Sequence, residues 1–202
     1  MRILGIDPGS RLTGYGCIDQ VAGQLVHVAH GTLRLSNTSG RAVIPLEQRL
    51  LLIYEGLSEV IKEFRPRVLA IEKVFFAKNA VSALKLGQAR GAAILTGMIH
   101  GVEIVEYSAT EVKQSVVGHG QADKEQVAKM IELLLGKRDF ETFDASDGLA
   151  LAICHAHHIR GAVSGQRAIP KKSKRMSLAE SLGITLEQVG NRKRIDITSR
   201  DS

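Results

Sequence analysis

The order of its apolar segments is the feature that most constrains the fold of this 202-residue chain. Three short segments that alternate apolar and polar residues come first, separated by turns that contain glycine, and this pattern predicts strands. Short apolar runs then alternate with longer segments whose apolar residues recur every three or four positions, which is the spacing of helices. An antiparallel meander followed by alternating strands and helices predicts an α/β fold, a mixed sheet flanked by helices on both faces.

The bounds of these elements follow from the same patterns. We expect strands over residues 2–7, 12–19, 24–35, 68–72 and 103–107. We expect helices from near Pro45 to Pro66 and over residues 79–100, 108–117, 123–135 and 144–160. Asp123 precedes Gln126 by three residues, which is the spacing of a capping box at a helix start.

Charge divides the chain near residue 160. Residues 1–159 hold 17 basic and 17 acidic side chains, whereas residues 160–202 hold ten basic and four acidic ones and carry the whole net charge of +6. Such a basic run is either a solvated tail or a contact for nucleic acid. We therefore predict one domain over residues 1–160 and a basic C-terminal tail over 161–202 that is either disordered or partly helical.

The remaining composition is that of a globular protein, with 44% hydrophobic and 24% charged residues. No apolar run is long enough to span a bilayer and no leader peptide is visible, so we expect a soluble, cytoplasmic protein without membrane contact. Cys17 and Cys154 lack the spacing of a disulfide framework or a zinc knuckle. We do not expect zinc at the histidines beside Cys154, because a helix dipole favours histidines in the last turn of a helix.

Four carboxylates stand at positions where sites form in folds of this kind. Asp7 and Glu72 end two of the predicted strands, and sites in such sheets lie beyond the carboxyl ends of the strands. Asp144 and Asp147 are three residues apart at the start of the last helix, so their side chains share one face of its first turn. That helix is apolar nearly all round, which predicts that it is buried.

Each carboxylate also has a purely structural interpretation. Asp7 is a candidate cap for the turn at Pro8, and Glu72 is a candidate ion-pair partner of Lys73 or Lys78. The two helix aspartates suit a helix start, because free amide groups and the helix dipole favour acidic residues there. These interpretations explain the four residues one at a time, but not their common position at the edge of one sheet.

Convergence of the four groups would require a cation. Two carboxylates about 4 Å apart repel by roughly 4 kcal/mol at an effective dielectric constant near 20. Mg²⁺ prefers oxygen ligands, and two such ions about 3.5–4 Å apart hold the attacking and leaving oxygens of a phosphodiester. The pattern therefore predicts a site for two Mg²⁺ ions, with Mn²⁺ able to substitute.

Four stretches resemble the sequence blocks of the RuvC crossover junction endodeoxyribonucleases, the bacterial Holliday-junction resolvases. They are "GIDPGSRLTGYG", "IEKVFFAKNAVSALKLGQARGA", "VKQSVVGHGQADKEQV" and "DASDGLALAICHAH". The resemblance covers about residues 1–160 and implies a ribonuclease H-like fold, a homodimer and partnership with the branch-migration proteins RuvA and RuvB. The implied activity is Mg²⁺-dependent, paired symmetrical nicking of four-way DNA junctions at preferred sequences, in homologous recombination and DNA repair.

The resemblance also implies roles for particular residues. The family's acidic tetrad falls on Asp7, Glu72, Asp144 and Asp147. Phe75 falls on the aromatic residue that stacks on bases near the crossover, and Lys113 and Lys124 fall on basic residues that contact the junction near the scissile phosphate. By pattern alone, Phe75 also suits a core and the lysines suit an ordinary helix surface. Gly148 departs from the alanine expected after the second aspartate, and the tail is longer than expected, with its function left open.

Other functions are compatible with parts of this pattern. A YqgF-type nuclease of the same fold shares the first block. An actin- or Hsp70-like ATPase also has an Asp-x-Gly motif after its first strand, but it needs a second glycine-rich phosphate loop, which is not visible. A non-catalytic junction-binding protein would not need four acids. For the homodimer, the candidate interface is the helix rich in alanine and glycine over residues 79–100.

Overall fold

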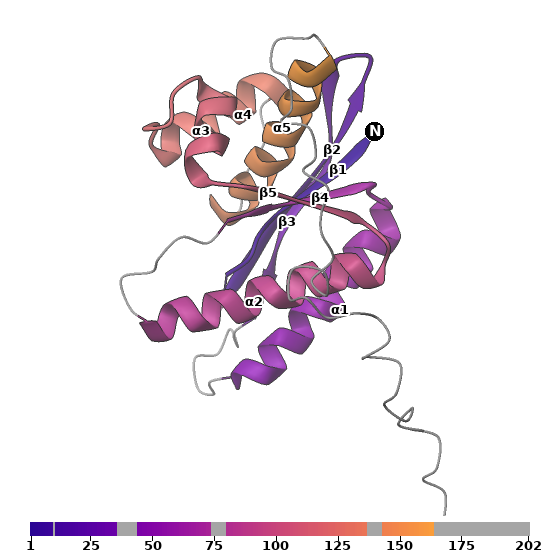
Figure 1. Ribbon diagram of the computed structural model, residues 1–202, viewed down its shortest axis with the longest axis vertical. Coiled ribbons are helices and arrows are strands. Elements are labelled where there is room, and N and C mark those ends of the chain that lie inside the picture. The colour runs from indigo at the N-terminus through magenta and orange to yellow at the C-terminus, as the bar shows by residue number, and fades with distance from the viewer. Residues whose placement is uncertain (10, 36–43, 74–79, 137–142, 164–202) are drawn as a thin grey trace, which may run out of the picture. The chain divides into compact units, whose positions relative to one another are not determined.

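The computed structural model describes residues 1–9, 11–35, 44–73, 80–136 and 143–163. Its helices and strands belong to the unit Met1–Ser164 (Figure 1). The strands are β1 (Arg2–Asp7), β2 (Leu12–Val21), β3 (Gln24–Arg34), β4 (Val68–Glu72) and β5 (Glu103–Tyr107). The helices are α1 (Leu46–Phe64), α2 (Ala80–Ile99), α3 (Ala109–Val117), α4 (Lys124–Leu135) and α5 (Phe143–Val163).

The five strands form one mixed sheet in the order β3-β2-β1-β4-β5. The pairs β1–β2 and β2–β3 are antiparallel, whereas β1–β4 and β4–β5 are parallel. This confirms the predicted meander followed by parallel strands. In the parallel register Ile6 lies beside Ile71, so β1 and β4 end next to each other.

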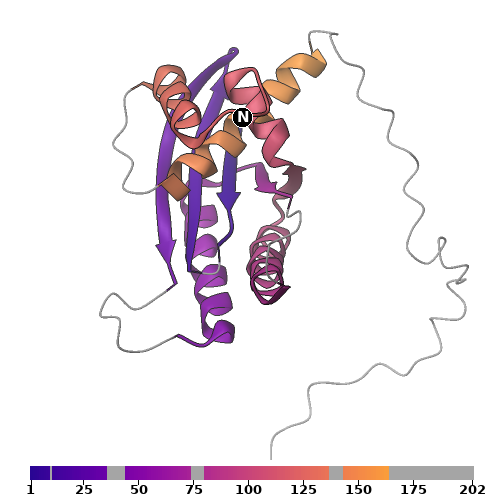
Figure 2. The same ribbon diagram turned by 90° about the vertical axis from the view of Figure 1, so that its left-hand side faces the viewer.

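Helices cover both faces of the sheet, as predicted. Helices α1 and α2 pack against each other on one face, and α3, α4 and α5 gather on the other (Figures 1 and 2). Successive side chains of a strand point to opposite faces. Ile3 therefore belongs to the hydrophobic cluster beneath α5, whereas Leu4 and Ile6 belong to the cluster beneath α1 and α2.

Glycines let α5 approach the sheet closely. A Cβ atom on Gly5 or Gly16 would collide with the backbone of α5, at Gly148 and Leu149 respectively. In the opposite direction, a Cβ on Gly148 would lie 2.7 Å from the amide nitrogen of Gly16. Gly148, which replaces the expected alanine, lowers helix propensity. It lies where the backbone of α5 contacts β2, so a side chain there would collide with the strand.

The predicted bounds agree closely with the observed ones. The predicted strands 2–7, 68–72 and 103–107 coincide with β1, β4 and β5, while β2 runs two residues further than expected. The predicted capping box at Asp123 is present, with its side chain accepting from the amide of Gln126 at 2.8 Å. Within the described part of the chain, no helix combines the length and apolar character needed to cross a membrane.

Most of the predicted tail lies outside the described residues. Helix α5 continues to Val163, three residues beyond its expected end. The division of the chain into a domain over 1–160 and a tail over 161–202 therefore stays a prediction.

Candidate active site

The carboxylates of β1 and β4 face α5. Asp7 shares a strand face with Gly5, which lies directly beneath α5. Glu72 shares a strand face with Ala70, which belongs to the hydrophobic cluster beneath the same helix. Because β1 and β4 are neighbours in parallel register, the two carboxylates end adjacent strands on one face of the sheet.

Helix α5 brings a third carboxylate to the same place. Asp147 lines a pocket of about 290 Å³ together with Asp7 and Glu72. Its side chain is 28% exposed, so the pocket is accessible from solvent. The backbone of Asp144 starts the same helix one turn earlier, and its side chain lies outside the described residues. Three of the four predicted acids thus line one pocket, although they are far apart in the sequence.

The charges in this pocket interact. Burial raises the pKa of Glu72, the negative charge of Asp147 raises it further, and Lys124 and Lys113 lower it. The Nζ of Lys124 donates to Oδ2 of Asp147 at 3.0 Å. Because like charges are held together in a partly dry site, a cation bound there would relieve their repulsion.

Backbone contacts from two elements hold Glu72 in position. Nε of Arg90 on α2 donates to the Glu72 carbonyl at 3.0 Å, and Nη2 of Arg90 lies 2.6 Å from a carboxylate oxygen of Glu106. The amide of Lys73 donates to the Tyr107 carbonyl at 2.8 Å. The end of β4 is therefore fixed by both α2 and β5.

The side chain of Lys73 does not support the ion-pair interpretation of Glu72. Its Nζ lies 3.6 Å from the carboxylate of Glu111, on α3. Lys78, the other candidate partner, lies outside the described residues.

Two lysines from successive helices complete the polar lining. Lys113 on α3 and Lys124 on α4 both line the pocket. Capping boxes fix the starts of the two helices, one at Ser108 and one at Asp123. The box at Ser108 was not predicted. Spacing alone described these lysines as ordinary surface residues, whereas the tertiary structure brings both to the carboxylates.

The rest of the lining is apolar, and the sequence did not single out these residues. They are Ala109, Val112, Val127, Ala150 and Leu151. Their only signal was membership of the apolar faces of α3, α4 and α5. Within the described ranges, no group of three or more His, Cys, Asp or Glu side chains is arranged as a metal site. Asp144 and Phe75 are the predicted site residues whose side chains are outside those ranges.

The cysteine and histidines late in α5 make contacts within the fold. Nδ1 of His155 lies 2.7 Å from the Tyr107 hydroxyl, and Nδ1 of His158 lies 2.8 Å from the carbonyl of Cys154. Burial raises the pKa of the Cys154 thiol to about 12, which keeps it protonated. The His155 contact joins α5 to β5, whereas the His158 contact lies within α5.

Comparison with known proteins gives consistent matches. The family model of the crossover junction endodeoxyribonuclease RuvC matches residues 3–155. A relative of that name from Geobacter metallireducens is 54% identical over 157 residues, which cover 78% of this chain and 93% of the relative. Another, from Pseudomonas syringae, is 54% identical over 155 residues, which cover 77% of this chain and 86% of the relative.

Solved structures agree with these sequence matches. Thermus thermophilus RuvC, solved in complex with a Holliday junction substrate, has a TM-score of 0.72 and 31% identity, covering 82% of this chain and 97% of that one. The yeast mitochondrial resolvase Ydc2, at 12% identity and a TM-score of 0.60, shares the fold over 81% of this chain and 82% of its own. The mixed sheet and its helices define a nuclease domain of the ribonuclease H-like class. Within that class, the chain belongs to the RuvC family of crossover junction endodeoxyribonucleases.

Proposed function

We propose that this chain resolves four-way DNA junctions by paired symmetrical nicks, through Mg²⁺-dependent hydrolysis of phosphodiesters. The observation that carries the proposal is that carboxylates from β1, β4 and α5 line one pocket, together with lysines from α3 and α4. The substrate class is supported by the Thermus thermophilus relative, which was solved with a Holliday junction.

The donor set of the pocket fits Mg²⁺. Asp7, Glu72 and Asp147 offer only oxygen ligands, and Asp144 would be the fourth ligand, from the first turn of α5. Four carboxylates match the charge of two Mg²⁺ ions, and Mn²⁺ would be able to substitute. When bound, the metal supplies a nucleophilic water and stabilises the charge that develops on the phosphate. The carboxylates themselves hold and orient the cations.

The two lysines suit contacts with the phosphate backbone. Lys124 is 67% exposed and already bonds a carboxylate oxygen, so a phosphate oxygen of the substrate can compete for the same donor. We assign Lys113 and Lys124 to positioning of the scissile strand, which carries no sequence information. Phe75, outside the described residues, is the proposed stacking residue, and such stacking contributes about 1–3 kcal/mol per base.

A homodimer matches a nearly symmetric junction, because two equivalent sites then meet two equivalent strands. Helix α2 supplies the interface in our proposal. Val81, Leu84, Leu95 and Met98 on this helix are each 59–65% exposed, and a Cβ on Gly91 would meet no atom within 4 Å. A second copy of this helix would bury that apolar stripe. By family resemblance, RuvA and RuvB are the proposed partner proteins.

Cleavage of a mobile four-way junction, with Mg²⁺ present or chelated, tests the proposal. Asp7→Asn should preserve junction binding and abolish nicking, because the amide keeps the shape of the side chain but lacks its charge. Glu59→Gln, an exposed change on α1, is the matched control and should nick normally. Normal nicking by Asp7→Asn would refute the assignment of the metal site.

Two further measurements separate the proposal from its alternatives. Preference for RNA over a four-way junction would indicate a YqgF-type nuclease. Turnover of ATP without DNA would indicate an ATPase, and junction binding without nicks would indicate a non-catalytic binding protein.

A further inference from the structure

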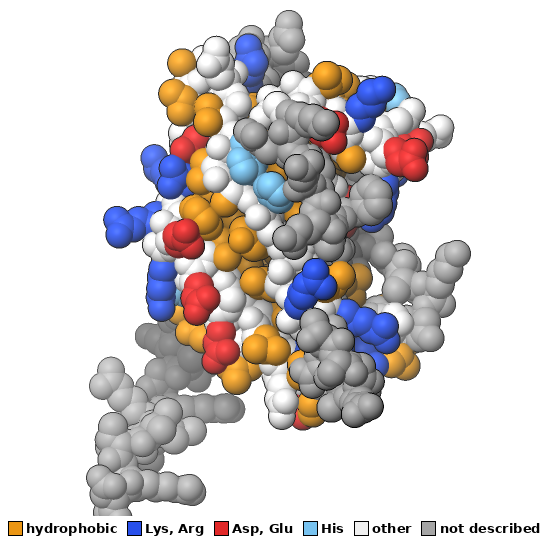
Figure 3. All heavy atoms as spheres, turned by 180° about the vertical axis from the view of Figure 1, so that it is seen from behind, with side chains coloured by type: hydrophobic (Ala, Val, Ile, Leu, Met, Phe, Trp, Pro, Cys, Tyr) orange, Lys and Arg blue, Asp and Glu red, His pale blue; other side chains and the backbone are white. Residues whose placement is uncertain are grey.

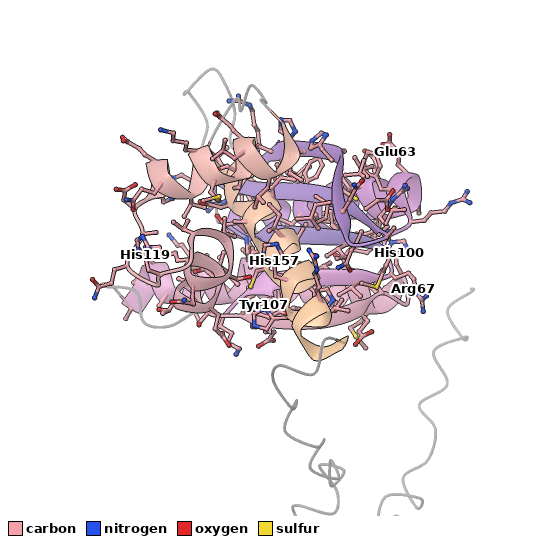
Figure 4. All side chains as sticks on the ribbon, turned by 90° about the horizontal axis from the view of Figure 1, so that it is seen from above. Glu63, Arg67, His100, Tyr107, His119 and His157 are labelled. Carbon is pink, nitrogen blue, oxygen red and sulfur yellow. The ribbon has the colours of Figure 1, made fainter. Side chains whose placement is uncertain are left out.

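A second pocket lies at the other end of the sheet from the carboxylates. It has a volume of about 420 Å³ and is lined by Ile61, Lys62, Arg65, Pro66, His100 and Val102. Figure 4 shows His100 and Arg67 together at the end where β4 begins, and His119, between α3 and α4, toward the opposite end. A ligand in this pocket would therefore leave the carboxylates accessible to DNA.

The backbone holds Arg65 in an unusual conformation. Arg65 caps α1 with φ 49° and ψ 55°, in the left-handed region, while its amide donates to the Ile61 carbonyl at 2.8 Å. Glycine is the common residue at such a helix end, because a side chain there costs free energy. An arginine in this position places a cation at the pocket despite that cost, and strained backbone of this kind is often associated with function.

The other polar groups around the pocket are also positioned. Oγ of the buried residue Ser58 lies 3.0 Å from Nε2 of His100, which fixes the imidazole ring. No carboxylate is among the six residues that line the pocket. Glu59 and Glu63 on α1 and Glu103 on β5 are close to lining residues along the chain, but none of them lines the pocket. Figure 3 shows basic side chains along the left edge of the molecule, with acidic ones directly beside them.

We propose that this pocket binds an acidic segment of a protein partner. Lys62 and Arg65 would pair with its carboxylates, and an aliphatic side chain of the segment would lie on the floor formed by Ile61, Pro66 and Val102. This inference does not depend on the proposed nuclease chemistry, because none of these residues lines the carboxylate pocket.

The shape and charge of the pocket favour this occupant over two others. Duplex DNA binds through phosphates spread along its length, whereas the Lys and Arg side chains that line this pocket are only Lys62 and Arg65. The chain's own residues 160–202 carry ten basic and four acidic side chains, so the cations of the pocket repel that segment.

The test uses a fluorescent peptide in which Glu and Leu alternate, with binding to the full chain followed by anisotropy. Arg65→Gly removes the guanidinium and leaves a residue that accommodates the left-handed backbone, so this variant is expected to fold. It should weaken peptide binding about tenfold, as expected for loss of a charged hydrogen bond. Ala22→Gly is the matched control, because Ala22 also has φ 49° and does not line the pocket. It should leave peptide binding unchanged.

Two further results decide between interpretations. A peptide in which Glu and Ser alternate should bind more weakly than the Glu-Leu peptide, because it cannot cover the apolar floor. Equal peptide affinity of Arg65→Gly and the unchanged chain would overturn the proposal. The proposal would also be overturned if the unchanged chain bound no peptide and Arg65→Gly lowered the affinity for duplex DNA. The pocket would then be a contact for phosphates. Mg²⁺-dependent nicking by Arg65→Gly should equal that of the unchanged chain.

Discussion

Helices α2 and α5 have similar lengths, 20 and 21 residues, and similar compositions, yet most of α5 is buried and most of α2 is not. From Ala145 to Ala156, every residue of α5 except Asp147 is buried. In contrast, the buried residues of α2 are Ala89, Ala93, Thr96 and Gly97, and its first half exposes Val81 and Leu84.

The difference arises from the surfaces beneath the two helices. Helix α5 crosses strands that present Gly5, Gly16 and Ala70, so its backbone approaches the sheet closely. Helix α2 meets bulkier side chains, since a Cβ on Gly97 would lie 2.6 Å from a methyl group of Ile104. Composition therefore does not distinguish a helix buried by its own sheet from one that leaves an apolar face exposed.

The largest expected effect concerns the contact between α5 and the strands beneath it. Gly16→Ala forces a Cβ against the backbone of Leu149 and should lower the free energy of unfolding by about 3 kcal/mol, the upper range for overpacking. Gly87→Ala on α2, where a Cβ meets no atom within 4 Å, should instead raise it by about 0.5–1 kcal/mol. Urea unfolding measures both. Equal stability of Gly16→Ala and the unchanged chain would mean that α5 is not held by this contact.

The second prediction concerns the exposed face of α2. Leu84→Glu should weaken homodimerisation at least tenfold, about 1.4 kcal/mol, because a charge would be buried between two copies of the helix. Leu133→Glu, at a leucine of α4 that is 72% exposed, should leave the dimer intact. Sedimentation equilibrium measures the dissociation constant. A dimer that tolerates Leu84→Glu would exclude this face of α2 as its interface.

The smallest effect concerns the buried polar end of α5. Burial lowers the pKa of His155 below its ordinary 6.5, so the unfolded chain binds the extra proton first as the pH falls. The stability from neutral His155 is present above about pH 6.5 and is lost as the pH falls through the lower pKa of the folded state. His155→Gln should flatten this part of the curve of unfolding free energy against pH. An unchanged slope would show that His155 does not contribute.

Another group titrates in a separate pH range and serves as an internal reference. Hydrogen bonds from Ser108 lower the pKa of Glu111 below its ordinary 4.5. The stability linked to Glu111 is therefore present above about pH 4.5 and is lost as the pH falls further. His155→Gln should leave that more acidic part of the curve unchanged.

Local patterns in the sequence were sufficient to predict the elements and the positions of the acids. Strand alternation, helix spacing and the capping box at Asp123 depend on residues a few positions apart, and they located β1, β4, β5 and the start of α4. The same patterns put Asp7 and Glu72 at strand ends. Because the site lies where strands end, these positions indicated a site before any contact was known.

What the tertiary structure decided is which distant residues meet. Periodicity described Lys113 and Lys124 as surface residues, and only the packing of α3 and α4 against α5 brings them to Asp147 and Glu72. Helix propensity indicates only that Gly148 weakens its helix. The contact of its backbone with β2 explains why the residue has no side chain. A sequence states the chemistry and local conformation of each residue, but contacts across the fold depend on how whole surfaces pack, and no local pattern contains that information.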